Sequence, residues 1–252
     1  MGPLQGLAIL AAGIFAGTVN AIVGSGSLVT FPVLLAFGYS PLVANVSNTV
    51  GLVPGTISGA IGYRRELRGQ RRRLFRLAGF AAAGGLVGGL LLLAAPGTFE
   101  AIVPLLVIGA ALLMAAQPRV SAWLRARDIP GEPRREPRVL VPLAVGTTGI
   151  YGGYFGAAQG VILLALLGLL LDDDLQRLNG AKNVLAAIVN GVAAVLFIAV
   201  SEVDWAVVGV LAVGSILGGQ LGAAVGRRVP GAVLRVVIVV GGLAVGTVLL
   251  LT

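Results

Sequence analysis

The apolar residues of this chain are gathered into eight segments, most of them about 20 residues long, and no other feature constrains the fold so strongly. A helix of about 20 apolar residues crosses the hydrocarbon core of a bilayer. Hydrophobic residues make up 57% of the chain and charged residues only 11%, which excludes an ordinary water-soluble domain. We therefore expect an all-α integral membrane protein with apolar segments at 4–36, 41–63, 77–95, 99–116, 139–171, 177–200, 205–225 and 232–251.

Two of these segments, 4–36 and 139–171, have 33 residues each and are too long for one straight crossing. Glycine-rich sequence interrupts both of them, at Gly24–Ser27 in the first and at 149–160 in the second. Glycine weakens a helix and lets another backbone approach closely. We therefore predict that each long segment is either a broken crossing or a re-entrant hairpin.

Each long segment is followed by a helix whose first turns contain asparagine, and then by two plainer apolar segments. Gly24 matches Gly160 at an offset of 136 residues, and Asn48 matches Asn183 at an offset of 135. The chain is therefore predicted to contain two tandem repeats of about four helical segments, a construction common in transporters. We expect the first transmembrane repeat at 1–117, a basic cytoplasmic linker at 118–138 and the second transmembrane repeat at 139–252.

The positions of the positive charges distinguish two topologies. Thirteen of the 18 Lys and Arg residues lie in 64–76 and 119–138, which marks both stretches as cytoplasmic. If the long segments cross the membrane, there are eight crossings, and four arginines after residue 176 fall at or near the opposite side. If they are re-entrant hairpins, the two repeats are inverted, both termini lie outside, and 17 Lys and Arg residues lie inside with none outside. We favour this second topology because it obeys the positive-inside rule better.

Missing residue types narrow the chemistry. The chain has no histidine and no cysteine, which excludes Ser-His and Cys-His catalysis, disulfides, and histidine or thiolate metal sites. We expect no metal, no cofactor and no enzyme activity; Lys182 with Ser25 or Ser47 is the one hydrolytic pair left, and no motif supports it. The basic stretches lie between apolar segments and contain few aromatic residues, so no nucleic-acid partner is expected.

The two interruptions are the first candidates for a binding site. Unwound backbone at membrane depth is tolerated where it lines a cavity or is buried in protein. Free N–H groups at the start of a half-helix bind anions. We therefore predict a site for a small anionic solute that includes Gly24, Ser25, Gly26, Ser27, Gly156, Gln159 and Gly160.

Lys182 is the clearest cation inside an apolar segment, where a charge is costly and tends to be functional. We predict that it offsets the charge of the substrate; the alternative is that its side chain snorkels to the membrane interface. No carboxylate is clearly embedded, so the sequence indicates no coupling ion and leaves an anion channel or an uncoupled uniporter as the alternative. Asn45 is one of several embedded amides, and the other polar residues of the predicted site are Asn20, Ser47, Asn48, Thr49, Tyr154, Asn183 and Asn190.

Several motifs follow one another in both halves of the chain. In the first half they are residues 20–35 (NAIVGSGSLVTFPVLL), 44–49 (ANVSNT), 54–55 (PG) and 62–65 (GYRR). In the second half they are residues 149–157 (GIYGGYFGA) and 178–183 (LNGAKN). In this order they resemble the signatures of the sulfite exporter TauE/SafE family, also called the toluene-sulfonate uptake permease family. Where that family often has Gly-Gly-Gly, this chain has Gly24-Ser25-Gly26 and, in its second half, Ala157–Gly160.

The resemblance implies a multi-pass carrier of the bacterial inner membrane that moves sulfite, an organosulfonate or another small sulfur-containing anion. We therefore predict a secondary transporter, a permease or exporter, that works by alternating access around a site at the membrane midplane. The expected partners are a small anionic solute and the lipid bilayer. A homo-oligomer is compatible with the sequence.

Overall fold

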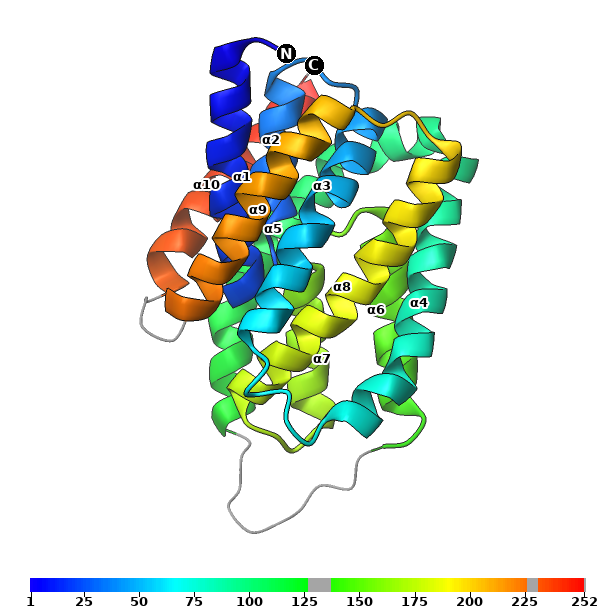
Figure 1. The fold of residues 1–252 in the computed structure, drawn as a ribbon, viewed down its shortest axis with the longest axis vertical. Coiled ribbons are helices and arrows are strands. Elements are labelled where there is room, and N and C mark those ends of the chain that lie inside the picture. The colour runs from blue at the N-terminus through cyan, green and yellow to red at the C-terminus, as the bar shows by residue number, and fades with distance from the viewer. Residues whose placement is uncertain (127–136, 226–230, 252) are drawn as a thin grey trace.

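The computed structural model describes residues 1–126, 137–225 and 231–251, which form ten α-helices and no β-strand (Figure 1). The prediction of an all-α protein is therefore confirmed for these residues. The helices are α1 (Pro3–Ile22), α2 (Ser27–Ala36), α3 (Pro41–Gly62), α4 (Arg71–Ala94), α5 (Pro96–Ala126), α6 (Leu140–Tyr154), α7 (Gln159–Leu170), α8 (Leu175–Val200), α9 (Trp205–Val225) and α10 (Gly231–Leu251).

The helix ends follow the predicted apolar segments, with two exceptions. α4 begins at Arg71, six residues before the predicted start, because its first turns are basic and have no hydropathy signal. α5 continues through Pro118 to Ala126, although the sequence predicted an end at residue 116. Membrane helices tolerate proline where neighbouring groups bond to the freed carbonyl. The predicted linker at 118–138 therefore begins inside α5, and its residues 127–136 lie outside the described part of the chain.

Among the described residues, five helices are long and apolar enough to cross a membrane, namely α1, α4, α5 over Pro96–Arg119, α8 and α9 over Trp205–Ala224. α3 has the necessary length, but its residues 44–52 are all buried and include several polar side chains. It is therefore a central helix whose first half is surrounded by protein. α2 and α7 are apolar but have only 10 and 12 residues.

Both long segments are interrupted, and the two interruptions have the same backbone geometry. In the first, α1 ends at Ile22 and the N–H of Gly24 donates to the carbonyl of Val19; in the second, α6 ends at Tyr154 and the N–H of Gly156 donates to that of Tyr151. Both glycines have positive φ, +87° at Gly24 and +76° at Gly156, which an L side chain adopts only with strain.

The geometry corrects two details of the sequence interpretation. Gly156 is the counterpart of Gly24, so the offset between the interruptions is 132 residues, and the offset of 136 that pairs Gly24 with Gly160 is wrong. Residues 149–154 were expected to belong to the second interruption, but they are the last turns of α6. A chain with 39 glycines offers several alignments, and only the backbone torsions distinguish them.

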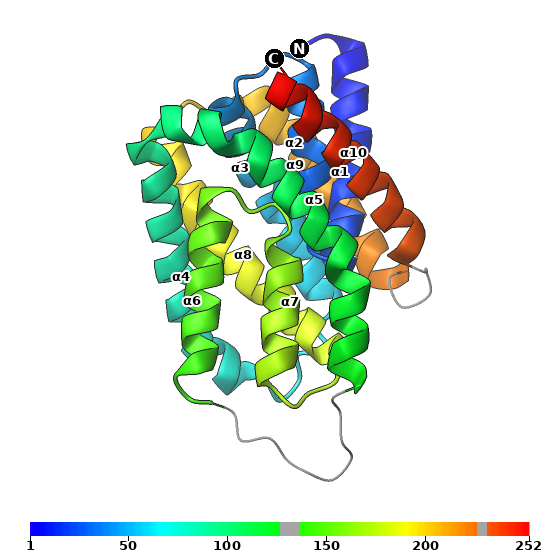
Figure 2. The ribbon, with the colours of Figure 1, turned by 180° about the vertical axis from the view of Figure 1, so that it is seen from behind.

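The helices on either side of each interruption turn back on one another (Figures 1 and 2). α1 begins and α2 ends at the end of the molecule where both chain termini lie. α6 begins and α7 ends at the opposite end. We call α1–α2 the first hairpin and α6–α7 the second hairpin. Their tips point toward each other in the interior of the bundle.

Each hairpin packs against a helix from the other half of the chain. α9 packs along α1 and α3, whereas α4 packs along α6 and α8. Glycines make these crossings close. A Cβ at Gly218 of α9 would lie 2.0 Å from the carbonyl oxygen of Ile14, and a Cβ at Gly88 of α4 would lie 2.0 Å from that of Ile150. The helices thus meet backbone to backbone, as in other membrane bundles with small residues at the interface.

Positive charge is concentrated at the end opposite the termini. The α3–α4 and α7–α8 connections lie at that end (Figure 1), and seven arginines lie between Arg64 and Arg76. The connections at the end with the termini, residues 37–40, 95 and 201–204, contain no Lys or Arg and include Glu202 and Asp204. The bundle is therefore strongly asymmetric in charge along its long axis.

Candidate functional site

The two hairpin tips meet through their glycines. The N–H of Gly160 donates a hydrogen bond of 3.0 Å to the carbonyl oxygen of Gly24. A Cβ on Gly24 would lie 2.4 Å from the Cα of Gly160, a separation that real Cβ atoms do not show. The contact therefore requires glycine at both positions. Each of these glycines belongs to the glycine-rich stretch of its own hairpin.

Unpaired polar side chains lie on both sides of the glycine contact. Ser25 is 1% exposed and its Oγ has no hydrogen-bond partner among the described residues. Gln159 is 2% exposed, and its Nε2 likewise has no partner there. The Gln159 side chain occupies the space that a Cβ on Gly152 would need, since its Cδ lies 2.3 Å from that position. Both tips therefore offer buried donors directly beside the contact.

Asn48 on α3 is a third buried side chain with a free donor. It is completely buried, its Oδ1 accepts a hydrogen bond from Thr30 Oγ1 on α2, and its Nδ2 has no partner in the described structure. The hydroxyl of Thr30 thus fixes the orientation of the Asn48 amide and turns its NH₂ group away from α2. The sequence analysis missed Thr30; its position one turn after Gly26 in the first motif is the signal that was available.

Lys182 on α8 is fully buried in protein. A snorkelling side chain would instead carry its ammonium to the protein surface. The Lys182 Nζ donates one hydrogen bond of 3.3 Å to the carbonyl of Asn20, near the end of α1. No carboxylate lies within ion-pair distance of Lys182 in the described part of the chain. An ammonium has three N–H donors, so one backbone carbonyl leaves most of its capacity unused.

The carboxyl end of α1 is held by polar side chains of α8. Asn183 Nδ2 donates to the carbonyl of Ala21 at 3.2 Å, and Asn179 Nδ2 donates to the Tyr63 hydroxyl at 3.0 Å. The side chain of Asn20 itself donates to Thr56 on α3 at 3.0 Å. Asn183 and Lys182 thus bond to the carbonyls of Ala21 and Asn20, which the interruption leaves without helical partners. A cation is favourable at this end of a helix.

The second interruption is held in a similar way from α3. Asn45 Nδ2 donates to the carbonyl of Tyr154, the last residue of α6, at 3.1 Å. The Tyr154 ring packs edge-on against Phe99, with 5.6 Å between the ring centroids. Asn190 on α8 is close to this interruption, because its Oδ1 lies 3.9 Å from the position of a Cβ on Gly156. Tyr154, Gly156 and Asn190 therefore belong together at the second tip.

Three predicted residues have other roles or no visible one. Ser47 Oγ accepts a hydrogen bond of 3.0 Å from the N–H of Asp204, so it ties α3 to the start of α9. Ser27 is half-buried and Thr49 is buried, and neither side chain makes a hydrogen bond to another described residue. The structure thus brings Gly24 and Gly160 into contact, with Ser25 and Gln159 next to them in the chain. Asn20, Lys182 and Asn183 meet at the end of α1, Gly26 packs against α1, and Asn48 bonds to α2.

The electrostatic character of this region follows from its side chains. The side chains of the candidate site include three donors without a described partner, the Ser25 hydroxyl and the NH₂ groups of Asn48 and Gln159. They also include the Lys182 ammonium, which has one carbonyl partner, and all four residues are at most 2% exposed. The described acidic residues lie near helix ends, for example Asp173 before α8 and Asp204 before α9. A buried group of donors with a net positive charge can bind a negatively charged solute through charge-assisted hydrogen bonds.

Comparison with known proteins shows which family this chain is similar to. A family model described as "Sulfite exporter TauE/SafE" matches residues 9–249. The "Probable membrane transporter protein YfcA" of Escherichia coli (strain K12) is 30% identical over 209 residues, which are 82% of this chain and 75% of that protein. A "Probable membrane transporter protein" of Haemophilus influenzae is 28% identical over 223 residues, 86% of this chain and 84% of that protein. The chain therefore belongs to the sulfite exporter TauE/SafE family of membrane transporters.

Proposed function

We propose that this protein transports a small anion through the region where the two hairpin tips meet. The observation that supports this most directly is Lys182, a fully buried ammonium with one carbonyl partner and no described carboxylate beside it. A buried charge without a counter-charge is strongly unfavourable. A substrate anion would supply the missing negative charge. Its binding would relieve the unfavourable burial of the Lys182 ammonium, and this relief would contribute to the free energy of binding.

The free donors favour an oxyanion as substrate. The Ser25 hydroxyl and the NH₂ groups of Asn48 and Gln159 are donors without partners, and an anion with several oxygen atoms can accept from all of them. Sulfite and organosulfonates have three oxygens that share the negative charge. The description of the matching family names sulfite export, and we propose a sulfur oxyanion or an organosulfonate on these two grounds.

The proposed mechanism is alternating access between two inverted repeats. Equivalent interruptions recur after 132 residues, and the two hairpins enter from opposite ends of the bundle (Figures 1 and 2). In this proposal a pseudo-two-fold axis in the membrane plane relates the two repeats, as in other transporters with inverted repeats. Because Ser25, Asn48, Gln159 and Lys182 are all shielded from solvent, we interpret this conformation as occluded.

We further propose that the arginine-rich end faces the cytoplasm and that both termini face the periplasm of a bacterial inner membrane. The support is the absence of Lys and Arg from the connections at the end with the termini. With this orientation the first hairpin enters from the periplasm and the second from the cytoplasm.

The test is the variant Lys182→Met, studied by thermal unfolding of purified protein with sulfite, sulfate, thiosulfate and organosulfonates. A ligand of the wild type at about 100 times its Kd contributes about 2.7 kcal/mol to stability. We expect the variant to lose this ligand-dependent stabilisation while its unliganded Tm stays the same or rises, because an uncompensated buried charge has been removed. Flux into liposomes should fall with it.

The matched control is Arg65→Met, which also removes one positive charge but from an exposed position away from the hairpins. This variant should keep the full ligand response. If Lys182→Met lowers the unliganded Tm and keeps the ligand response, Lys182 is a structural cap of α1 and the proposal fails. Single-channel currents from the wild type in planar bilayers would refute alternating access.

A further inference from the structure

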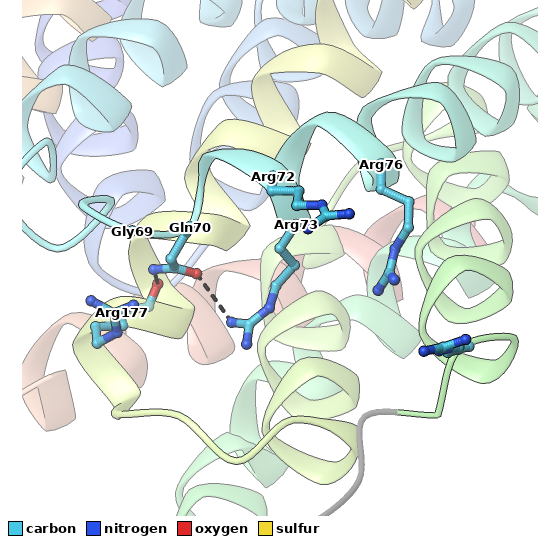
Figure 3. Close-up of a pocket in the computed structure, with 7 residues that line it drawn as sticks. Gly69, Gln70, Arg72, Arg73, Arg76 and Arg177 are labelled. Atoms are coloured by element: carbon cyan, nitrogen blue, oxygen red, sulfur yellow. Dashed lines mark hydrogen bonds between the residues drawn. The ribbon is translucent and has the colours of Figure 1, made fainter.

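The arginine-rich end of the bundle contains a cavity of about 680 Å³. It is lined by five arginines from three parts of the chain, Arg72, Arg73 and Arg76 on α4, Arg138 just before α6, and Arg177 on α8, together with Gly69 and Gln70. Figure 3 shows the side chains of α4 and α8 around the same opening. We call this cavity the arginine pocket. It is separate from the hairpin tips, and no part of the proposed transport mechanism uses it.

The inner side of the arginine pocket is held in place by hydrogen bonds. The Asp173 carboxylate accepts from Arg73 Nη1 at 2.7 Å and from Arg177 Nε at 2.6 Å. Gln70, which is 2% exposed, donates to the carbonyl of Arg177 at 3.1 Å and thereby links the α3–α4 connection to α8. Two of the five guanidinium groups are thus fixed before any ligand arrives.

The positive charge in the arginine pocket greatly exceeds the negative charge. Burial raises the pKa of the Asp173 carboxyl, but the hydrogen bonds and charges of Arg73 and Arg177 outweigh burial and bring the pKa below its ordinary value. Asp173 is therefore ionised at neutral pH and compensates one of five arginines. Arg72 and Arg138 make no hydrogen bond or ion pair with any other described residue. These two guanidinium groups are available to a ligand.

Exposed apolar residues adjoin two of the pocket arginines in the sequence. Phe75, which precedes Arg76, is 84% exposed; Val139 and Leu140, which follow Arg138, are 68% and 55% exposed. Exposed apolar side chains of this size belong against lipid in a membrane protein, whereas arginines belong at the head-group level. The edge of the pocket therefore lies where the hydrocarbon region meets the head groups.

We propose that the arginine pocket binds the phosphate group of an anionic phospholipid from the leaflet on the arginine-rich side. Guanidinium groups match phosphate oxygens with paired, charge-assisted hydrogen bonds. The acyl chains would lie along Phe75, Val139 and Leu140, which a soluble phosphate compound would not contact. Basic pockets between membrane helices on the cytoplasmic side are suited to such head groups.

The test compares lipid binding by the double variant Arg72→Gln/Arg138→Gln with that of the control Arg65→Gln/Arg119→Gln. Both remove two positive charges, and the control positions are exposed and do not line the pocket. Native mass spectrometry in detergent would count bound phosphatidylglycerol and phosphatidylcholine. We expect the wild type and the control to retain phosphatidylglycerol and the pocket variant to bind it about tenfold or more weakly. Phosphatidylcholine should bind weakly to all three.

Two additional experiments distinguish a lipid phosphate from free phosphate and replace the glutamine variant if it does not fold. Inorganic phosphate, titrated against thermal unfolding, should act only at much higher concentration than the lipid. Equal affinity for inorganic phosphate would overturn the lipid assignment, and equal loss of lipid in both double variants would overturn the pocket. If the glutamine variant does not fold, Arg72→Lys/Arg138→Lys keeps the charge but loses the paired geometry, and weaker lipid binding is expected there too.

Discussion

The contact between Gly24 and Gly160 predicts a graded effect of alanine substitution on stability. Gly24→Ala places a side chain at φ +87° and sets its Cβ 2.4 Å from the Cα of Gly160. The left-handed backbone costs about 1–2 kcal/mol for alanine. Overpacking a close contact costs about 1–3 kcal/mol. We therefore expect Gly24→Ala to lower the free energy of unfolding by about 2–5 kcal/mol.

Two further glycines separate these contributions. Gly38 has φ +84° but nothing within 4 Å of its Cβ position, so Gly38→Ala should show the backbone cost alone. Gly160 has no unusual φ but touches Gly24, so Gly160→Ala should show the packing cost alone. If the reasoning is right, the loss in Gly24→Ala approaches the sum of the other two.

Thermal unfolding of each purified variant in detergent measures these losses. For a chain of this length about 1 kcal/mol corresponds to a Tm change of about 2–4 °C. Gly24→Ala should therefore unfold roughly 4–20 °C below the wild type, and Gly38→Ala by about 2–8 °C. If Gly24→Ala is no less stable than Gly38→Ala, the hairpin tips do not meet at these glycines and the proposed site loses its geometric basis.

Three other substitutions test separate parts of the structure by the same measurement. Gly88→Ala, whose Cβ would lie 2.0 Å from the Ile150 carbonyl oxygen, should lower the free energy of unfolding by about 1–3 kcal/mol. Gly79→Ala on the same helix, with nothing within 4 Å of its Cβ position, should be neutral or stabilising. Equal effects of the two substitutions would mean that α4 and α6 do not cross at Gly88. Asn45→Leu should lower the free energy of unfolding by about 1–3 kcal/mol because it leaves the Tyr154 carbonyl without its donor. An unchanged Tm would argue against a role of this hydrogen bond in holding the end of α6. Asp173→Asn should cost about 1 kcal/mol at pH 7 after allowing for solvent screening. Because the pKa of Asp173 is lowered in the folded protein, this difference should persist down to pH 5 and disappear as the pH falls below about 4; a difference that does not depend on pH would contradict the ion-pair role.

The positions of most helices follow from hydropathy alone, because membrane-embedded backbone must form helices of fixed minimum length. This reasoning locates α3 within one residue and both ends of α8 within two, but it misses the first turns of α4, which are basic. It cannot reveal that Gly156 matches Gly24, since a positive φ leaves no mark in the sequence beyond glycine itself. Both hairpin interruptions could be predicted because glycines cluster there.

The candidate site was less accessible to sequence reasoning than the fold. Lys182 was identifiable because a lone charge in an apolar segment has few explanations. Its partner is the backbone carbonyl of Asn20. A bond to a backbone carbonyl cannot be predicted from the pattern of side chains in the sequence. Thr30 and Asn45 act through single contacts with Asn48 and with the Tyr154 backbone, which depend on how α2, α3 and α6 are placed in three dimensions.

The packing of the helices suggests which bodies move during transport. The sequence suggested that the halves 1–117 and 139–252 rock against each other, but α9 packs along α1 and α3, and α4 along α6 and α8, with glycines that bring the backbones into direct contact. Such contacts separate only with a large loss of packing. Under the proposed alternating access, each group of three helices would therefore move as a unit that contains parts of both halves, and the packing of α8 on α3 would change between the two groups. The bonds between Lys182 and Asn20 and between Asn45 and Tyr154 cross from one group to the other. The bond between Gly160 and Gly24 joins the two hairpin tips. In the proposed mechanism the polar residues of the candidate site would therefore lie at the interface that opens. An anion bound to Lys182 on one group and to Asn48 on the other would favour the closed arrangement of the two.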